Sequence, residues 1–374
     1  MLAYFCVSNF KNFSKELKFD LSSGRYAFND FNVENRVVKT AVVYGYNASG
    51  KSNLALAVFD IVRMLTDNEF SVSRYGNYKN ILRLNELTSF SYTFLFGKDE
   101  VVYSYEKDGL DKPIAERLFI NGRKKLSFDR RVGNEMQQSF EGAQTLERRI
   151  DNPNLSAVRY LRMNSSLPME NEDNAILLKF YGFVDRMLLF WCLQERNYIG
   201  FTSKVDNLID YIVNTEHLDA YNCFLREMGI DRRVVAKKTP DGRIVAYYDF
   251  GNGRLLEYVP NMSNGESSLL LFYYWYLQMD STRTPSLLFI DEFDAFYHIE
   301  LSKRLVELLS HNKDIQVVLT THNPHLMSNE ILRPDSYFVL SDNYIASIDK
   351  LTEKEIRQAH NLERLYIAGA FDGK

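Results

Sequence analysis

The chain has 374 residues, of which 45% are hydrophobic and 25% charged, with only 18 glycines and 8 prolines. This composition is typical of a folded globular protein with two or three domains, and it excludes a disordered, fibrous or low-complexity chain. The 45 lysines and arginines are outweighed by 49 acidic residues, giving a formal charge of -4, so nucleic acid could bind only at a local basic patch.

The cysteines and the apolar runs bear on the compartment. Cys6, Cys192 and Cys223 are far apart and odd in number, which argues against a disulfide framework and a zinc site. No stretch approaches the ~18 apolar residues that a membrane helix needs. The first residues also lack the basic leader and apolar core of a signal peptide. We therefore expect a cytoplasmic protein that does not enter the membrane.

The first predicted elements are a strand, a glycine loop and a helix. The β-branched run at residues 37–44 predicts a buried strand that stops at Gly45. From Ser52, apolar residues recur at helical spacing as far as Leu65. This order places the glycine loop between the end of a strand and the start of a helix.

An antiparallel β-subdomain is predicted at roughly residues 86–130. Apolar residues there alternate with polar ones, which is the period of a half-buried strand. Asp108-Gly109 and Asn121-Gly122 supply residues that accept a positive φ in hairpin turns. The segment therefore reads as a meander of paired strands.

A helical lobe is predicted next, because helical spacing dominates from Asn174 to Met228 and includes Met187 and Trp191. Two short strands, at 244–248 and 255–259, lead from it into a second block. That block is predicted as a helix at 267–279, a strand at 286–290, a helix at 300–309 and a strand at 315–320. Alternating strands and helices favour a parallel sheet covered on both faces. The expected division is residues 1–170, with the β-subdomain, then the helical insertion 171–235, then residues 236–374.

The strongest motif is the segment Gly45-Tyr46-Asn47-Ala48-Ser49-Gly50-Lys51-Ser52, which fits the Walker A pattern G-x-x-x-x-G-K-[ST] in the strand–loop–helix context that the motif requires. Its backbone N–H groups can surround phosphate oxygens, and the helix start adds a positive dipole end. Lys51 would meet the β- and γ-phosphates, and Ser52 would hold Mg²⁺. The predicted nucleotide contacts from this loop are Gly45, Asn47, Ala48, Ser49, Gly50, Lys51, Ser52 and Asn53.

A second motif is the apolar run 287–290, which ends in Asp291 and Glu292 as a Walker B strand does. Asp291 could join Ser52 as a metal ligand, while Glu292 could orient or deprotonate an attacking water. Alone, such a run is more often a buried strand with solvated acids at its end. The company of Lys51 and Ser52 favours the catalytic interpretation.

Two weaker elements follow the same pattern. Ser263 and Gly265, in Met262-Ser263-Asn264-Gly265-Glu266, precede a predicted helix and could bind an anion, although an ordinary N-cap serine explains them equally well. His322 follows a predicted strand, where a lone histidine is more often structural.

Together, these four elements resemble those of the ABC-type ATPases, in the branch that contains SMC heads, RecF and the OLD and AbiL-like phage-defence ATPases. The resemblance implies an α/β P-loop NTPase fold of ABC-ATPase type, in which a mixed sheet is joined by an antiparallel β-subdomain and an inserted helical lobe. It implies a head-to-tail pair of copies with ATP and Mg²⁺ between the Walker loop of one and Ser263 and Gly265 of the other. It also implies that Glu292 is the catalytic base and His322 the switch histidine, acting with Lys51.

The resemblance extends to both ends of the chain, with departures between them. Residues 7–13 resemble the first strand of this branch, whose following loop borders the nucleotide, and the tail 361–369 resembles the AbiL-like group. No glutamine occurs between Lys51 and Gln137, so the metal-sensing glutamine of the family has no counterpart at the join to the helical lobe. Asn264 stands where transporters carry glycine.

The function implied is that of an ATPase subunit of a prokaryotic anti-phage system of the abortive-infection type. A homodimer or higher even oligomer, gated by nucleotide, would control a separate effector such as a nuclease or toxin. One alternative is a RecF-like DNA-repair ATPase, which would bind duplex DNA through residues 123–162, where nine basic residues face five acidic ones. Another alternative is a scaffold clamped by ATP without turnover. The 212 residues from Lys51 to Ser263 argue against a transporter motor, which needs about half as many.

Overall fold

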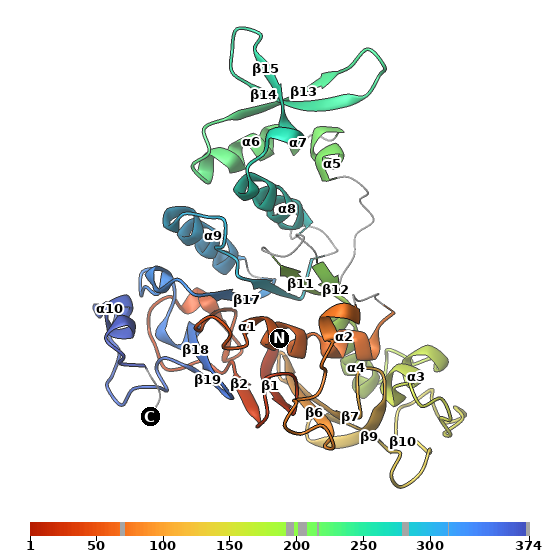
Figure 1. Cartoon of the computed structure of the whole chain (residues 1–374). Helices are drawn as coiled ribbons and strands as arrows, with labels where there is room; N and C mark the ends of the chain where they lie inside the picture. Colours follow the sequence, from red (N-terminus) through yellow and green to blue (C-terminus); the bar gives the residue numbers. More distant parts are fainter. Residues whose placement is uncertain are drawn as a thin grey trace.

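The computed structural model describes residues 1–67, 72–191, 198–200, 208–214, 217–278, 284–312 and 314–371. Two seven-stranded sheets form the larger part of the molecule, and a small three-stranded sheet lies at its far end (Figure 1). This mixture of parallel and antiparallel strands with helices confirms the predicted α/β class.

The lower sheet is antiparallel throughout and runs in the order β10-β9-β8-β7-β6-β1-β2. It contains the predicted meander, and it also takes in the N-terminal strand, which pairs with β6. The bounds are β1 Leu2–Ser8, β2 Leu17–Asp20, β6 Thr88–Phe96, β7 Asp99–Lys107, β8 Pro113–Ile120, β9 Arg123–Asp129 and β10 Gln137–Gln138. A separate hairpin joins β3 (Val33–Glu34) to β4 (Val37–Val38).

The upper sheet runs in the order β12-β11-β16-β17-β5-β18-β19. Its five inner strands are parallel and the two outer ones antiparallel. The bounds are β5 Thr40–Tyr44, β11 Met187–Trp191, β12 Tyr198–Gly200, β16 Leu287–Asp291, β17 Gln316–Thr321, β18 Tyr337–Ser341 and β19 Tyr344–Ser347. Every residue of β5, β11, β16 and β17 is buried, as expected for parallel strands covered on both faces.

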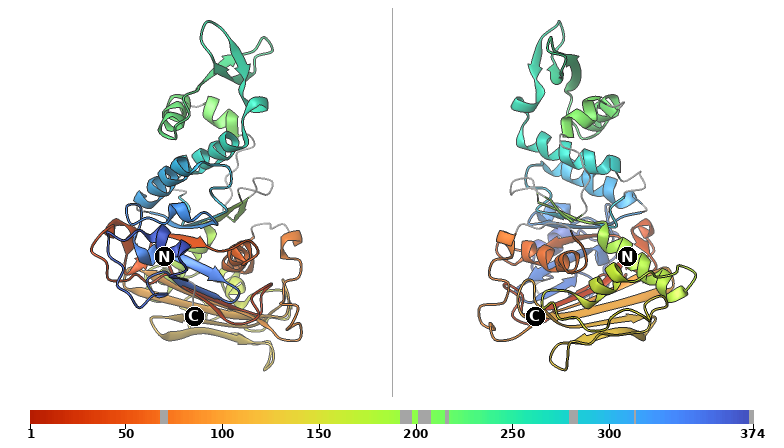
Figure 2. Two further views of the ribbon diagram at one scale, coloured as in Figure 1. Left: turned by 60° about the vertical axis from the view of Figure 1, so that its left-hand side comes forward. Right: turned by 90° about the vertical axis from the view of Figure 1, so that its right-hand side faces the viewer.

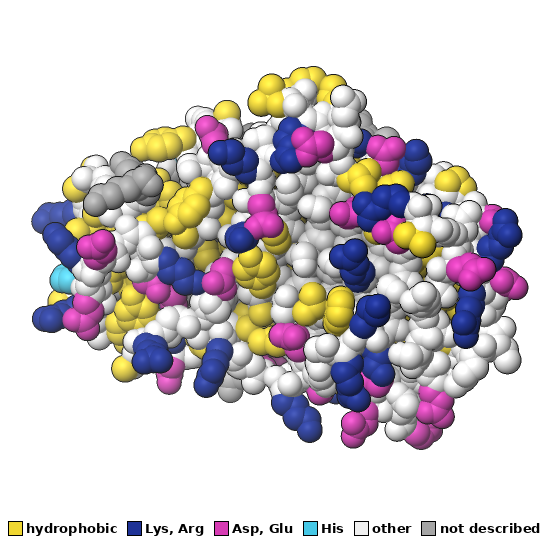
Figure 3. Space-filling view, turned by 90° about the horizontal axis from the view of Figure 1, so that it is seen from below, with side chains coloured by type: hydrophobic (Ala, Val, Ile, Leu, Met, Phe, Trp, Pro, Cys, Tyr) yellow, Lys and Arg dark blue, Asp and Glu magenta, His cyan; other side chains and the backbone are white. Residues whose placement is uncertain are grey.

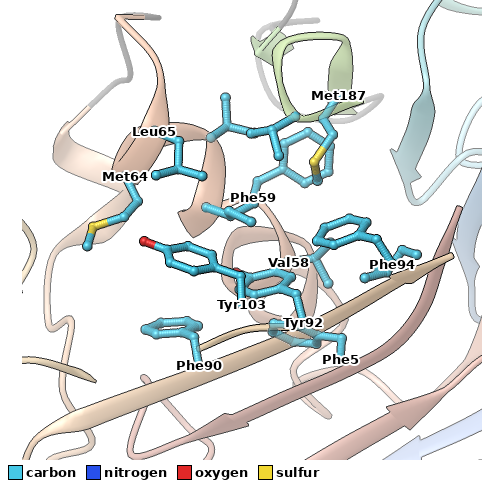
Figure 4. Packing of buried hydrophobic residues seen from close by; sticks show 14 of the residues in the cluster. Phe5, Val58, Phe59, Met64, Leu65, Phe90, Tyr92, Phe94, Tyr103 and Met187 are labelled. Carbon is cyan, nitrogen blue, oxygen red and sulfur yellow. The ribbon is translucent and has the colours of Figure 1, made fainter. Parts of the chain in front are cut away.

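Successive residues of β5 face two different cores, so this sheet has a helical layer on each side. Ala41 and Val43 join the core beneath it, whereas Val42 and Tyr44 join the core above. The lower core packs α1 (Lys51–Val58), α2 (Asp60–Leu65) and α4 (Glu172–Asp185) against aromatic residues of the antiparallel sheet (Figure 4). The layering of sheet, helices and sheet can be followed in Figure 2.

The upper core contains α8 (Asn264–Gln278) and α9 (Ile299–His311). Beyond α8 lies the small sheet, in the order β13-β14-β15, with α5, α6 and α7 beside it (Figure 1). The bounds are α5 Leu208–Asn214, α6 His217–Glu227, β13 Arg233–Lys238, β14 Ile244–Asp249, β15 Leu255–Glu257 and α7 Tyr258–Asn261. The remaining helices are α3 (Ala157–Asn164), α10 (Leu362–Ile367) and the 3₁₀ turns Asp30–Asn32, Val72–Tyr75, Pro324–Leu326 and Pro334–Ser336.

Two sequence predictions were wrong. Met187–Trp191 was expected to be helical, but it is strand β11, paired in parallel with β16. A short apolar run that is buried on both sides cannot be told from a helix by periodicity alone. The helix before it, α4, covers the antiparallel sheet, so both elements belong to the sheet cores rather than to a separate helical lobe. The strand expected at 255–259 stops at Glu257, and α7 follows.

Among the segments described, no helix combines the length and the apolar character needed to cross a bilayer.

Candidate nucleotide-binding site

The predicted Walker loop leaves β5 and turns into α1 through left-handed backbone. Ala48 and Gly50 have φ of 66° and 101°. A side chain at Gly50 would also lie 2.4 Å from Nδ2 of Asn12. Glycine is therefore required at this position both for its conformation and for the space it leaves.

Lys51 is the first residue of α1, and its ammonium group points back into the loop. Nζ donates hydrogen bonds to the carbonyls of Gly45 (2.7 Å) and Tyr46 (3.2 Å). Burial lowers the pKa of Lys51, and the nearby Glu292 and Asp291 oppose this shift. The cation thus sits in the turn of the loop, where a phosphate would enter.

Asn12 braces the loop from the N-terminal motif that follows β1. Its Oδ1 accepts a hydrogen bond from Nδ2 of Asn53 (2.7 Å), and its Nδ2 lies within a long hydrogen bond of the Ser49 carbonyl (3.4 Å). Residues 7–13 were expected to border the nucleotide, and these contacts place Asn12 against the Walker loop.

The two predicted metal ligands meet, although 239 residues separate them. The Ser52 hydroxyl donates to Oδ2 of Asp291 at 2.6 Å, which joins the start of α1 to the end of β16. Oδ1 of Asp291 accepts a second bond from the hydroxyl of Thr320, also at 2.6 Å. Serine and aspartate oxygens are hard donors of the kind that Mg²⁺ prefers, so the residues present fit that ion.

Glu292 follows directly, with its backbone in the left-handed region at φ 50°. Burial raises the pKa of its carboxyl, the charge of Asp291 adds to that shift, and Lys51 and His322 oppose it. A half-buried carboxylate with a raised pKa beside a metal-binding residue is suited to accept a proton from water. His322, which contributes to this electrostatic environment, lies exposed just after β17.

The predicted signature lies at the start of α8, and Figure 1 shows this helix in the upper part of the molecule, away from α1. The backbone N–H and the hydroxyl of Ser263 both donate to Oε2 of Glu266 (3.0 and 2.8 Å), and Glu266 N–H donates back to Ser263 Oγ (3.2 Å). This is a capping box, so the N-cap role is present whatever else the serine does. The Tyr248 hydroxyl donates to the other oxygen of Glu266 (2.8 Å); burial alone would raise the pKa of Glu266, but these bonds keep it low.

Gly265 packs closely against the segment that follows the Walker B strand. A side chain there would lie 3.1 Å from the carbonyl oxygen of Phe296. In the described parts of the chain, no hydrogen bond or ion pair joins Ser263 or Gly265 to the Walker loop. One copy therefore brings together Lys51, Ser52, Asp291, Glu292 and His322, but not the signature.

Most basic side chains of the segment 123–162 are engaged within the protein. Figure 3 views the molecule from below and shows lysine and arginine interspersed with acidic side chains. Arg130 donates to backbone carbonyls of Pro113, Ile150, Asn152 and Leu155. Those in ion pairs are Arg123, Lys125, Arg131, Arg149, Arg159 and Arg162. The segment therefore presents less free positive charge than its composition indicates.

Comparison with protein families gives a match over most of the chain. The profile of a family described as "AAA domain, putative AbiEii toxin, Type IV TA system" matches residues 41–328. The chain belongs to this family. The match begins in β5, ends beyond His322, and confirms the predicted resemblance to this class of nucleotide hydrolases.

Solved structures similar to this AAA-domain protein include three SMC heads, each 14% identical to it. The SMC head domain from Thermotoga maritima has a TM-score of 0.45 and covers 92% of this chain and 97% of its own. An SmcHead bound to the C-winged helix domain of ScpA gives 0.49, with 93% and 98% covered. An Smc head with an extended coiled coil, bound to the C-terminal domain of ScpA derived from Pyrococcus furiosus, gives 0.46, with 93% and 97% covered. No curated protein matches the chain.

Sequence reasoning missed two residues that hold this AAA domain's site together. Thr320, next to the singled-out Thr321-His322, bonds to Asp291. Tyr248, in a predicted strand, reaches Glu266. A threonine at the end of the strand beside a Walker B strand could have suggested the first, because neighbouring parallel strands end at the same edge.

Proposed function

We propose that this AAA-domain protein binds ATP with Mg²⁺ and hydrolyses it. The observation that carries the proposal is the 2.6 Å hydrogen bond between Ser52 and Asp291, which joins the phosphate loop to a buried carboxylate with Glu292 beside it. Backbone N–H groups of the loop and the Lys51 ammonium would hold the phosphates. Bound Mg²⁺ would neutralise charge on the phosphate oxygens.

In this proposal each side chain has a separate task. Ser52 and Asp291 supply oxygen ligands to the metal, and Lys51 leaves its loop carbonyls for phosphate oxygens. Glu292 accepts a proton from the attacking water, which its raised pKa favours. His322, on the exposed end of β17, would contact the γ-phosphate side of the site.

We further propose that two copies form the complete site, head to tail. Support comes from the separation of the two half-sites in one copy: the signature at the start of α8 makes no hydrogen bond or ion pair with the Walker loop in the described segments. Ser263 and Gly265 of one copy would close over the phosphates held by the other. Hydrolysis would then separate the copies.

The biological role that we propose is control of a separate effector in an anti-phage system of the abortive-infection type. The family description supports this role, because it names a toxin of a type IV toxin–antitoxin system. The effector, a nuclease or toxin, would respond to the ATP-bound pair. Co-purification of a co-encoded protein with such activity is the direct test of this part.

The central experiment uses Glu292→Gln, which keeps the shape of the side chain but cannot accept the proton. With ATP and Mg²⁺, this variant should form a stable dimer by light scattering, while the wild type cycles and shows less dimer. Lys51→Ala is the matched control, since it should remain monomeric with ATP. If Glu292→Gln and wild type bind ATP, dimerise alike and release no phosphate, ATP is a clamp rather than a substrate. If duplex DNA stimulates turnover with a steep salt dependence, the repair alternative is favoured.

A further inference from the structure

Thr320 lies near the end of β17, between the Walker A strand β5 and the Walker B strand β16, and is completely buried. Its hydroxyl makes two hydrogen bonds that point in opposite senses. It donates to Oδ1 of Asp291 (2.6 Å) and accepts from the backbone N–H of Glu292 (2.8 Å). One hydroxyl therefore contacts both the predicted metal ligand and the residue predicted to be the base.

The backbone at Glu292 needs such support. A positive φ is uncommon for a residue with a side chain, and it persists only where the surroundings hold it. Besides the bond from Glu292 to the Thr320 hydroxyl, the N–H of Phe293 donates to the Thr320 carbonyl (3.2 Å). Thr320 thus holds two successive amides and fixes the turn that aims the Glu292 side chain.

The same hydroxyl divides the oxygens of Asp291 between two tasks. Oδ1 is held by Thr320, while Oδ2 faces Ser52 on the phosphate loop. When Ser52 and Oδ2 turn to a metal ion, the bond at Oδ1 can remain. The carboxylate then keeps its orientation without using the oxygen that the metal needs.

We infer that Thr320 is a positioning residue for hydrolysis, which orients Asp291 toward Mg²⁺ and sets Glu292 in the conformation that meets the attacking water. The inference rests on the proposed ATPase function. It requires that loss of the hydroxyl slow the chemical step much more than it weakens ATP binding, because Thr320 lies beneath the reacting groups and not against the phosphate loop.

The test compares Thr320→Val, which keeps the shape and removes the hydroxyl, with Thr320→Ser, which keeps the hydroxyl. Thr40→Val is the matched control: Thr40 is a buried threonine in the adjacent strand β5, and its hydroxyl has no hydrogen-bond partner within the described structure. We expect kcat to fall about 10²-fold in Thr320→Val, as misplacement of catalytic groups by about 1 Å can cause. Thr320→Ser and Thr40→Val should stay within about fivefold of wild type, and the Kd for ATP without metal should change little in all three.

The double variant Thr320→Val with Glu292→Gln separates positioning from general damage. It should be no slower than Glu292→Gln alone, because a base that has been removed no longer needs orientation. Should Thr320→Val fail to fold, Thr320→Ala provides a second variant without the hydroxyl, compared in the same way with Thr320→Ser.

Wild-type kcat in the folded variants that lack the hydroxyl, or an equal loss in Thr320→Ser, would overturn the inference while leaving the ATPase proposal intact. Absence of phosphate release by the wild type, under conditions where it binds ATP, would instead overturn the proposed function.

Discussion

Replacement of Asp60 by asparagine should destabilise the protein strongly. Asp60 begins α2 and is completely buried beneath the nucleotide-binding helix. Its carboxylate accepts two bonds from Lys107 Nζ (3.0 and 3.1 Å), one from the Tyr105 hydroxyl (2.8 Å) and one from the Tyr78 hydroxyl (2.9 Å). In Asp60→Asn, the Lys107 cation would remain buried without its counter-charge.

The size of the loss follows from the burial of Lys107, which is only 1% exposed. Breaking a buried ion pair by removing one partner costs about 3–5 kcal/mol. We therefore expect Asp60→Asn to lower the free energy of unfolding by about 4 kcal/mol at pH 7. Lys107→Met should cost less, because both tyrosines still donate to Asp60. The double variant should be more stable than the sum of the two single losses predicts.

The assay is urea unfolding of the full chain, with pH as a second variable. Burial lowers the pKa of Lys107 in the fold. Between that pKa and the unfolded value near 10.4, the unfolded chain binds more protons, so the free energy of unfolding of Asp60→Asn should rise with pH. Asp111→Asn is the control: it removes a carboxylate that is 54% exposed from its pair with Arg63, and it should cost less than about 1 kcal/mol. A loss below about 1 kcal/mol in Asp60→Asn, or strictly additive single variants, would refute this reasoning.

The remaining predictions concern the nucleotide site. Gly50→Ala should abolish ATP binding, measured by fluorescence of a nucleotide analogue, since a methyl group would lie 2.4 Å from Asn12 Nδ2 in left-handed backbone; binding as tight as wild type would contradict the loop geometry. Lys51→Ala should also bind ATP at least 10²-fold more weakly in the same assay, as loss of a charged phosphate contact predicts, and an unchanged Kd would show that the cation does not meet the phosphates. The acid limb of kcat should lie above pH 4.5, because burial raises the pKa of Glu292 and only its carboxylate accepts a proton; a limb at or below that pH would exclude Glu292 as the titrating base.

The sequence predicted those parts of the site that local rules determine. A glycine loop before Lys51 requires a strand on one side and a helix on the other, and both were found. An apolar run ending in Asp291 and Glu292 is buried until the acids begin, as the structure has it. The contact between Ser52 and Asp291 could be expected from the motifs together.

The missing parts depend on neighbours that a single sequence does not reveal. Met187–Trp191 is a strand because β16 lies beside it, and its apolar run carries no period that distinguishes the two structures. Thr320 bonds to Asp291 only because β17 lies next to β16 in the sheet. The strand expected at 255–259 stops early, and the helical turn after it contains Pro260, which has no N–H to donate to a ladder.

The internal hydrogen bonds of Lys51 set a limit on how tightly this loop can hold a nucleotide. The ammonium already has two carbonyl acceptors, at Gly45 and Tyr46, so an incoming phosphate displaces partners rather than meeting a bare cation. The measured affinity therefore reports a difference between two sets of contacts, and it will be weaker than the new set alone would give. A nucleotide that has left costs the protein little, because the lysine returns to acceptors within its own loop, and this favours rapid exchange of ADP for ATP.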